Sequence, residues 1–319
     1  MEALLKQLKF EIKRFNIKDK EIESVFIGGG TPSTISPKLY KPIFEYLKPY
    51  LLADIEITSE ANPNSATKEW LKGMWDLGVN RISFGVQSFN KDKLKTLNRA
   101  HSNQDAIEAV LNANKIGFKN ISLDLIYGTL NDTQELLQND LETAISLPIN
   151  HLSAYALTIE EGTPFASKPH MSKETLKTTQ WFFDEIQKND FKQYEISNFG
   201  KYQSTHNIGY WKYKDYIGLG SGAVGKLNMQ RFYPNKNIEA YIKNTLDIEI
   251  EILSSQDKKM EQLFLGFRSC VGVESKILNA LELKQAKILL EENKLTRKNE
   301  TFYNKNYLLA DEITLYLLS

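Results

Sequence analysis

The sequence predicts an α/β fold in which helices cover a parallel β-sheet. Short apolar runs rich in β-branched and aromatic residues alternate with helical patterns, and each gap between runs is long enough for one helix. Strands that are buried on both faces and joined by helices form parallel sheets. The architecture is therefore a doubly wound sheet or a complete or partial (β/α) barrel.

The expected strands lie at 24–28, 54–59, 81–86, 121–125, 152–157 and 193–196. An amphipathic helix is expected from the first residues, and further helices at 36–51, 67–77, 103–116, 133–146 and 173–189. Ser36 followed by Pro37 is typical of a helix start, since serine caps the free N–H groups and proline fits the first turn. Active sites of such folds lie at the carboxyl ends of the strands.

The pattern changes after Pro234, so we expect a barrel domain at 1–234 and a C-terminal domain at 235–319. Helices are expected at 238–246, 255–267 and 286–293, then a short hairpin from 295–297 and 301–303, and a last helix. This order is winged-helix-like. Acidic side chains are spread through the segment, which favours a packing or partner-docking role over nucleic-acid binding.

Composition excludes several classes of protein. Forty basic side chains balance forty acidic ones, so the net charge gives no bulk attraction to nucleic acid or to an anionic membrane. The single cysteine, Cys270, excludes an intramolecular disulfide and any site that needs two thiolates from this chain. No apolar stretch approaches the ~20 residues of a membrane span. We expect a soluble, cytoplasmic protein.

The first candidate site follows the strand at 24–28, where Gly28, Gly29 and Gly30 precede Thr31. Without Cβ atoms, such a turn lets a ligand approach backbone N–H and C=O groups closely. The segment has neither the Gly-Lys-Ser/Thr of a P-loop nor the Gly-x-Gly-x-x-Gly of a dinucleotide site. Alone, it is as well explained by a tight turn between a strand and a helix.

Further polar side chains stand near the ends of the following strands: Glu60, Gln87 and Asp124. Their carboxylates and amide suit an ammonium group, ribose hydroxyls or the edge of a base. Arg99 is suited to hold a ligand carboxylate with two parallel hydrogen bonds. Each residue alone is more simply a surface or capping residue, but four of them behind a glycine turn favour a binding site.

Three strings carry a specific resemblance: FIGGGTPS at 26–33, RISFGVQSF at 81–89 and LDLIYG at 123–128. They resemble the oxygen-independent coproporphyrinogen III oxidase family of radical S-adenosylmethionine (SAM) proteins, and the resemblance covers nearly the whole chain. It implies a partial (β/α) barrel of radical SAM type. It also implies that Gly29, Gly30 and Thr31 contact the methionine part of SAM, and it assigns the remaining ligand contacts to Glu60, Gln87, Arg99 and Asp124.

One branch of this family holds the oxidases, and a second branch holds heme chaperones. The segment HNIGYW at 206–211 is similar to the His-Asn-x-x-Tyr-Trp motif of the chaperone branch, where the motif is implicated in heme binding. The resemblance implies His206 as a ligand of heme iron, with Tyr210 and Trp211 against the macrocycle. Respiratory hemoproteins are the implied acceptors. The alternatives are coproporphyrinogen III decarboxylation and a catalytically silent interaction protein.

The chain departs from the family at the [4Fe–4S] cluster. Family members hold the cluster with a Cys-x-x-x-Cys-x-x-Cys motif after the first barrel strand, and this sequence lacks that motif. We expect that the first strand and the cluster loop are missing. The causes considered are a misplaced start or truncation, a degenerate paralogue, and a cluster supplied elsewhere. A full-length version should bind the cluster, SAM and heme. This chain should bind no cluster and form no 5′-deoxyadenosyl radical, and no catalytic residue is assigned.

Overall fold

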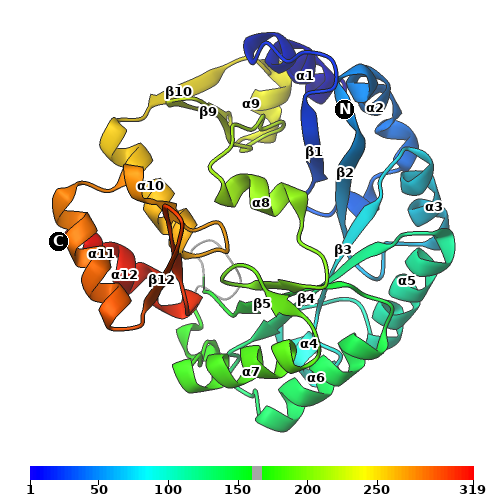
Figure 1. Ribbon diagram of the computed structural model, residues 1–319. Helices are drawn as coiled ribbons and strands as arrows, with labels where there is room; N and C mark the ends of the chain where they lie inside the picture. Colours follow the sequence, from blue (N-terminus) through cyan, green and yellow to red (C-terminus); the bar gives the residue numbers. More distant parts are fainter. Residues whose placement is uncertain (160–166) are drawn as a thin grey trace. The chain divides into compact units, whose positions relative to one another are not determined.

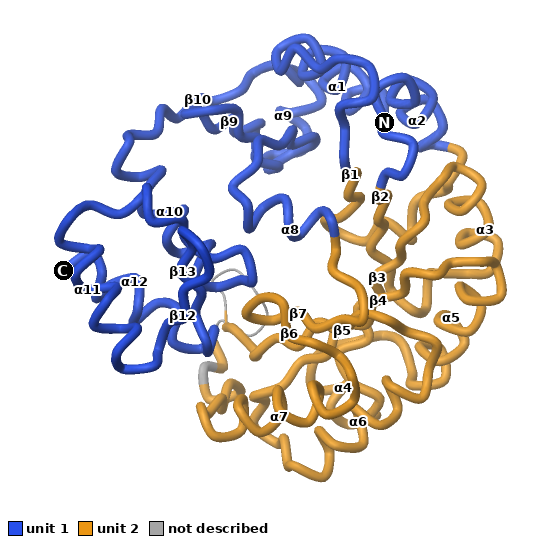
Figure 2. Tube along the Cα trace, in the orientation of Figure 1, with its two compact units in different colours: residues 1–23, 39–55, 205–319 blue, residues 24–38, 56–204 orange. Residues whose placement is uncertain are grey.

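The computed structural model describes residues 1–159 and 167–319. Contacts along the chain divide it into two compact units, which Figure 2 shows in different colours. Unit 1 comprises residues 1–23, 39–55 and 205–319, and unit 2 comprises residues 24–38 and 56–204. The predicted division at residue 234 stays a prediction.

The largest sheet has seven strands in the order β1-β2-β3-β4-β5-β7-β6. The strands are β1 (Ile22–Ile27), β2 (Leu51–Ala61), β3 (Arg81–Gln87), β4 (Asn120–Tyr127), β5 (His151–Ala156), β6 (Lys192–Gln193) and β7 (Asn198–Gly200). From β1 to β5 each strand lies beside the next one in the sequence. A doubly wound sheet reverses its strand order at a switch point, so this order belongs to the barrel type.

Helices separate the strands of unit 2: α3 (Lys68–Asp76), α4 (Lys91–Thr96), α5 (Asn103–Ile116), α6 (Gln134–Ser146) and α7 (Leu176–Lys188). Figure 1 shows α3, α5 and α6 along one face of the parallel strands. The side chains of Ile82, Leu123 and Leu152, from three neighbouring strands, are completely buried. Burial of apolar side chains on adjacent strands is what holds this sheet to its helices.

The ends of α5 illustrate how the sequence sets the element boundaries. Ser102 and Asp105 form a capping box at its start, in which each side chain accepts a hydrogen bond from the other residue's backbone. Gly117 follows the last residue with φ 125°, which glycine adopts readily. The sequence predicted this helix with the bounds that the structure shows.

Two predicted elements were wrong, the strand at 193–196 and the helix at 36–51. The run at 193–196 was expected as a strand of a parallel sheet, but β6 ends at Gln193 and β7 pairs antiparallel with both β5 and β6. Four residues separate β6 from β7, which is too short for a parallel crossover. The helix expected at 36–51 is broken into η2 (Pro37–Leu39), α2 (Lys41–Leu47) and η3 (Lys48–Tyr50), and Leu51 belongs to β2. Pro49 supplies no N–H donor to a continued helix.

Unit 1 contains α1 (Glu2–Arg14), α8 (Thr205–Trp211), α9 (Ile238–Lys243) and a three-stranded antiparallel sheet. The sheet has the order β10-β9-β8, with β8 at Gly225–Leu227, β9 at Gln230–Pro234 and β10 at Ile248–Ile252. None of these three strands was predicted from the sequence. In β10 the isoleucines alternate with glutamates, which is a strand pattern, but the run is short and follows a helix.

The C-terminal part of unit 1 has its own buried core, to which Leu263, Phe267, Val273 and Phe302 contribute. Its elements are α10 (Ser255–Phe267), α11 (Ala280–Glu291), α12 (Ala310–Leu318) and a sheet of order β11-β13-β12. The predicted hairpin forms from β12 (Leu295–Lys298) and β13 (Thr301–Asn304) between α11 and α12. The helix–hairpin–helix order of the prediction is confirmed. In the described part of the chain, no helix is both long and apolar enough to span a membrane.

Candidate functional site

The glycine turn follows β1 directly and has the backbone geometry that only glycine adopts easily. Gly29 and Gly30 have φ of 78° and 56°, and a Cβ atom built on either would meet nothing within 4 Å. The turn is anchored at its far end, because Ser33 Oγ accepts a hydrogen bond from the N–H of Asn62 at 3.0 Å. The open space in front of the turn lets a ligand reach its backbone.

Glu60 stands near the end of β2 and holds the glycine turn from the other side. Its Oε2 accepts a hydrogen bond from the N–H of Gly29 at 3.2 Å. Burial raises the pKa of Glu60 above its usual range, while the Gly29 hydrogen bond and the Arg81 charge partly offset the rise. Glu60 therefore offers a half-buried carboxylate beside the turn.

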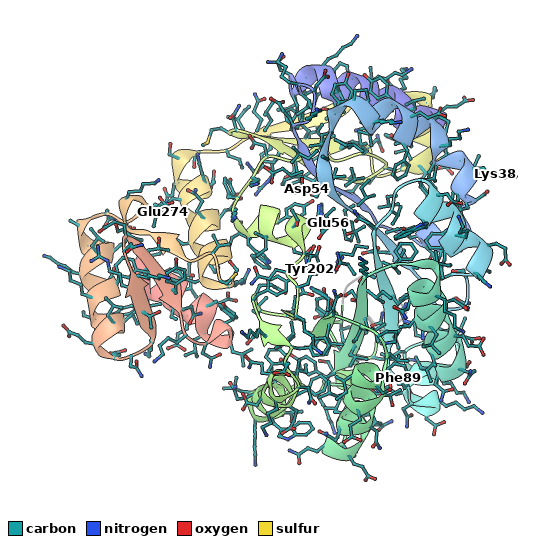
Figure 3. All side chains as sticks on the ribbon, turned by 45° about the vertical axis from the view of Figure 1, so that its right-hand side comes forward. Lys38, Asp54, Glu56, Phe89, Tyr202 and Glu274 are labelled. Carbon is teal, nitrogen blue, oxygen red and sulfur yellow. The ribbon has the colours of Figure 1, made fainter. Side chains whose placement is uncertain are left out.

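Gln87 closes β3 at an irregularity in the sheet. The register between β3 and β4 shifts between Phe84 and Gln87, and Gln87 has φ 69°, which non-glycine residues rarely adopt. Behind it, Asp140 accepts hydrogen bonds from the Ser88 hydroxyl at 2.7 Å and from the N–H of Phe89, a residue labelled in Figure 3, at 2.7 Å. These contacts fix the chain just after Gln87 and hold the strained residue in place.

Asp124 lies in β4, next to side chains of the neighbouring strands β3 and β5. It is paired with Ser153 in the register of β4 and β5, and its Oδ1 accepts a hydrogen bond from Ser83 Oγ at 3.3 Å. Burial raises the pKa of Asp124 to about 6. The Ser153 and Ser83 hydroxyls and the Arg81 charge lower that pKa, and the neighbouring Glu60 carboxylate raises it.

A pocket of about 290 Å³ brings three of the predicted residues together. Gln87, Arg99 and Asp124 line it, with Tyr155 among the residues from β5 and the segment after it. Arg99 is exposed, and it is the cation of this set. Glu60 joins the set through its charge interaction with Asp124. The arrangement offers carboxylates, an amide and a guanidinium to one polar ligand with both cationic and anionic groups.

A buried polar network lies behind this pocket. His151 is 1% exposed, its Nδ1 lies 2.7 Å from Ser122 Oγ, and its Nε2 lies 2.7 Å from the hydroxyl of Tyr194. Burial and the nearby Arg81 charge keep the pKa of His151 well below its usual range, so its ring is neutral. Arg81 Nη2 lies 3.4 Å from His151 Nδ1. These contacts give His151 a structural role.

Glu195, in the segment QYEISNF at 193–199, is another buried acid of unit 2. It is 1% exposed, and its Oε1 has no hydrogen-bond partner among the described residues. Burial raises the pKa of Glu195 to about 7, against hydrogen bonds from Ser197 and Asn198 that lower it. The pKa of Tyr155 is raised by burial first, and then by the charges of Asp124 and Glu195, which places these groups near one another.

The HNIGYW segment folds in unit 1 as the short helix α8 (Thr205–Trp211), an element that the sequence analysis did not predict. His206 and Tyr210 are four residues apart and share a face, and their ring centroids lie 4.9 Å apart at 85°. Tyr210 also packs edge-on against Tyr216 with centroids 4.6 Å apart. Trp211 follows Tyr210 and is half-buried. A helix therefore turns the motif into a row of aromatic rings.

Comparisons with known proteins agree with this geometry. Residues 2–144 match the Radical SAM superfamily model. The chain is 33% identical over 287 residues to the heme chaperone HemW of Lactococcus lactis, covering 86% of this chain and 75% of that protein. It is 36% identical to HemW of Haemophilus influenzae, covering 83% and 73% of the two chains.

The chain belongs to the HemW family. The coproporphyrinogen III oxidase HemN of Escherichia coli, a radical SAM enzyme, has a similar fold, with a TM-score of 0.81 at 19% identity, covering 99% of this chain and 82% of that one. The partial-barrel prediction and the family prediction are confirmed.

The site residues of this HemW family member fit SAM and do not fit the cluster. The carboxylates suit the ammonium group and ribose hydroxyls of SAM, and the guanidinium suits its carboxylate. The glycine turn leaves room for the ligand at the backbone. Cys270 is the only cysteine of the chain, so its residues cannot supply three thiolates. Among the described residues, no group of three or more His, Cys, Asp or Glu side chains is placed to hold a metal ion.

Several residues near the pocket of this HemW family member were not predicted from the sequence. Ser153 and Tyr155 are two apart in β5 and lie on the Asp124 side of the strand, where they and His151 alternate with the apolar Leu152, Ala154 and Ala156. That alternation was a usable signal. Arg81 is the first residue of the string RISFGVQSF. Its burial could not be predicted from the sequence, because contacts with residues far away in the chain decide it.

Proposed function

We propose that this protein is a heme chaperone that binds heme and delivers it to respiratory hemoproteins. The observation that carries the proposal is the placement of His206 and Tyr210 on one face of α8, in a chain related to proteins named heme chaperones. Imidazole is a common axial ligand of heme iron, and an aromatic face packs well on a porphyrin ring. His206 is the proposed iron ligand, with Tyr210 and Trp211 beside the macrocycle.

We propose further that Glu60, Gln87, Arg99 and Asp124 hold SAM together with Gly29, Gly30 and Thr31. The hydrogen bond between Gly29 and Glu60 supports this, since it keeps the turn and a carboxylate side by side. The raised pKa of Asp124 also supports it, because a buried carboxylate regains favourable partners when a cationic ligand arrives. The residues do not fit the cluster, so no radical step is assigned to this chain.

An anaerobic titration with hemin, followed by absorbance in the Soret region, tests the heme proposal. We expect saturable one-to-one binding that is lost in His206→Ala. His170→Ala is the matched control, since His170 is exposed while His101 and His151 are buried. Unchanged binding in His206→Ala would reject the proposed iron ligand, and no binding by the wild-type chain would reject the chaperone function.

Substrate turnover distinguishes the proposed chaperone from the alternative, a coproporphyrinogen III oxidase. A coproporphyrinogen III oxidase consumes its porphyrinogen and cleaves SAM, whereas a chaperone does neither. Incubation of the chain with coproporphyrinogen III and SAM should leave both unchanged. The likeness to the Escherichia coli oxidase shows the fold alone and does not favour this alternative.

A further inference from the structure

Unit 1 contains a cavity of about 440 Å³ that was not predicted from the sequence. It lies against α8, the loop that follows α8, strands β8 and β9, and α10. We call it the tyrosine pocket. Its walls are mainly apolar and aromatic, with Tyr210, Tyr216, Met260 and Phe264 among them. Pockets of this size and apolar, aromatic lining typically bind small organic ligands.

The tyrosine pocket is continuous with the heme motif through Tyr210. The ring of Tyr210 packs against the rings of both His206 and Tyr216, with centroid separations of 4.9 and 4.6 Å. Tyr210 and Tyr216 both line the pocket. A ligand in the pocket therefore lies against the aromatic row that begins at His206.

Four basic side chains line the tyrosine pocket, and two of them, Lys226 and Arg231, form ion pairs within the wall of the pocket. Lys226 is 3% exposed, its Nζ bonds to Asp215 at 2.5 Å, and it lies 4.3 Å from the ring centroid of Tyr213. Arg231 is held by Glu261, which itself accepts a hydrogen bond from Tyr213. The side chains of Lys226 and Arg231 are only 4% and 24% exposed in these ion pairs, so both cations are less accessible to a ligand than the other two.

The other two, Lys214 and Arg268, are held by exposed partners. The side chains of Lys214 and its partner Glu23 are 44% and 50% exposed. Arg268 Nη2 lies 2.6 Å from Asp311 Oδ1, with the two side chains 33% and 59% exposed. Exposed ion pairs contribute little to stability, so ligand carboxylates can replace these acids at small cost.

An aromatic pocket with two exchangeable cations fits a planar aromatic dicarboxylate. We infer that the tyrosine pocket holds the macrocycle of heme, and that Lys214 and Arg268 receive its two propionates. This inference rests on the proposed function, because that function supplies the porphyrin. It goes beyond the HNIGYW segment by assigning ligand contacts to the loop after α8 and to α10, and it assigns the carboxylate end of the ligand as well as its iron.

The test uses a probe that needs no axial ligand. Metal-free protoporphyrin IX keeps the macrocycle and both carboxylates, so its binding, measured by quenching of tryptophan and tyrosine fluorescence, depends on the tyrosine pocket alone. We expect the double variant Lys214→Ala/Arg268→Ala to bind it about tenfold more weakly. The dimethyl ester of the same porphyrin should bind both proteins equally, since its carboxylates are capped.

The chain offers a close control. Lys294 is 38% exposed and paired with Glu292, and Arg297 is 39% exposed, paired with Glu300 and 5.4 Å from the ring centroid of Phe302. Arg268 has the same kind of surroundings, 5.2 Å from the ring centroid of Phe264. The double variant Lys294→Ala/Arg297→Ala removes the same two residue types outside the pocket. It should bind protoporphyrin IX as the wild type does.

The outcomes separate the two proposals. If Lys214→Ala/Arg268→Ala binds protoporphyrin IX as tightly as the wild type, the pocket assignment is wrong, while a His206-dependent hemin complex would leave the chaperone function standing. If the control weakens binding equally, general surface charge explains the effect and the inference fails. If the wild type binds neither hemin nor protoporphyrin IX, both proposals fail together.

Discussion

The backbone N–H of Gly29 donates a hydrogen bond to Glu60 Oε2 at 3.2 Å, which ties the turn after β1 to the end of β2. Two segments separated by more than thirty residues thereby form one rim. Taken separately, the glycine turn is explained as a connection after a strand, and Glu60 as an acid near a strand end. The hydrogen bond that holds them side by side supports the proposed SAM site.

Replacing Glu60 with glutamine should weaken SAM binding about tenfold, since the neutral amide loses its charge interaction with the ligand ammonium. Isothermal titration calorimetry measures the change. Asp54→Asn is the control, because Asp54, labelled in Figure 3, is an exposed acid of the same strand. Equal loss in both variants would show that the effect is not local to the turn.

SAM binding should strengthen as the pH rises from 5 to 7. Burial raises the pKa of Asp124 to about 6, so the side chain is mostly protonated at the lower pH and ionised at the higher one. Only the ionised form attracts a cationic ligand, and the change in its population allows about a tenfold gain in affinity. Asp124→Asn should flatten this pH dependence, and a profile that persists in the variant would assign it to another group.

Gln87→Gly should be more stable to urea than Gln87→Ala by about 1 kcal/mol, since alanine keeps the left-handed strain at φ 69° and glycine does not. Both variants lose the amide, so both should lose the same affinity for SAM. Urea unfolding and calorimetry measure the two effects separately. Equal stability of the variants would mean that the bulge relaxes when the side chain is removed.

Glu195 should make the protein less stable as the pH rises. Burial raises its pKa from 4.5 to about 7, so in that window the folded chain binds more protons than the unfolded chain and the free energy of unfolding falls with pH. The cost of ionisation reaches about 3 kcal/mol above pH 7. Glu195→Gln should remove it, whereas the exposed Glu142→Gln on α6 should not. Urea unfolding at pH 5 and pH 8 checks the difference.

Local signals explain where the sequence predictions succeeded. The helix α5 carries a capping box at Ser102 and a glycine at its end, and β3 is a buried run between polar segments, so both were predicted closely. The three strands β8, β9 and β10 were missed, because short strands are defined by their partners as much as by their own residues. The helix α8 was missed because seven residues are too few to show a clear helical periodicity.

The sequence by itself determined the alternation of strands and helices, the glycine turn, and the candidate residues Glu60, Gln87, Arg99 and Asp124, because each depends on local pattern or residue type. Only the tertiary structure decided that β7 runs antiparallel, that Glu195 is buried, and that Lys214 and Arg268 line the same cavity as Tyr210. These facts depend on contacts between residues far apart in the chain. Burial and pairing are properties of the packed chain, and no local pattern encodes them.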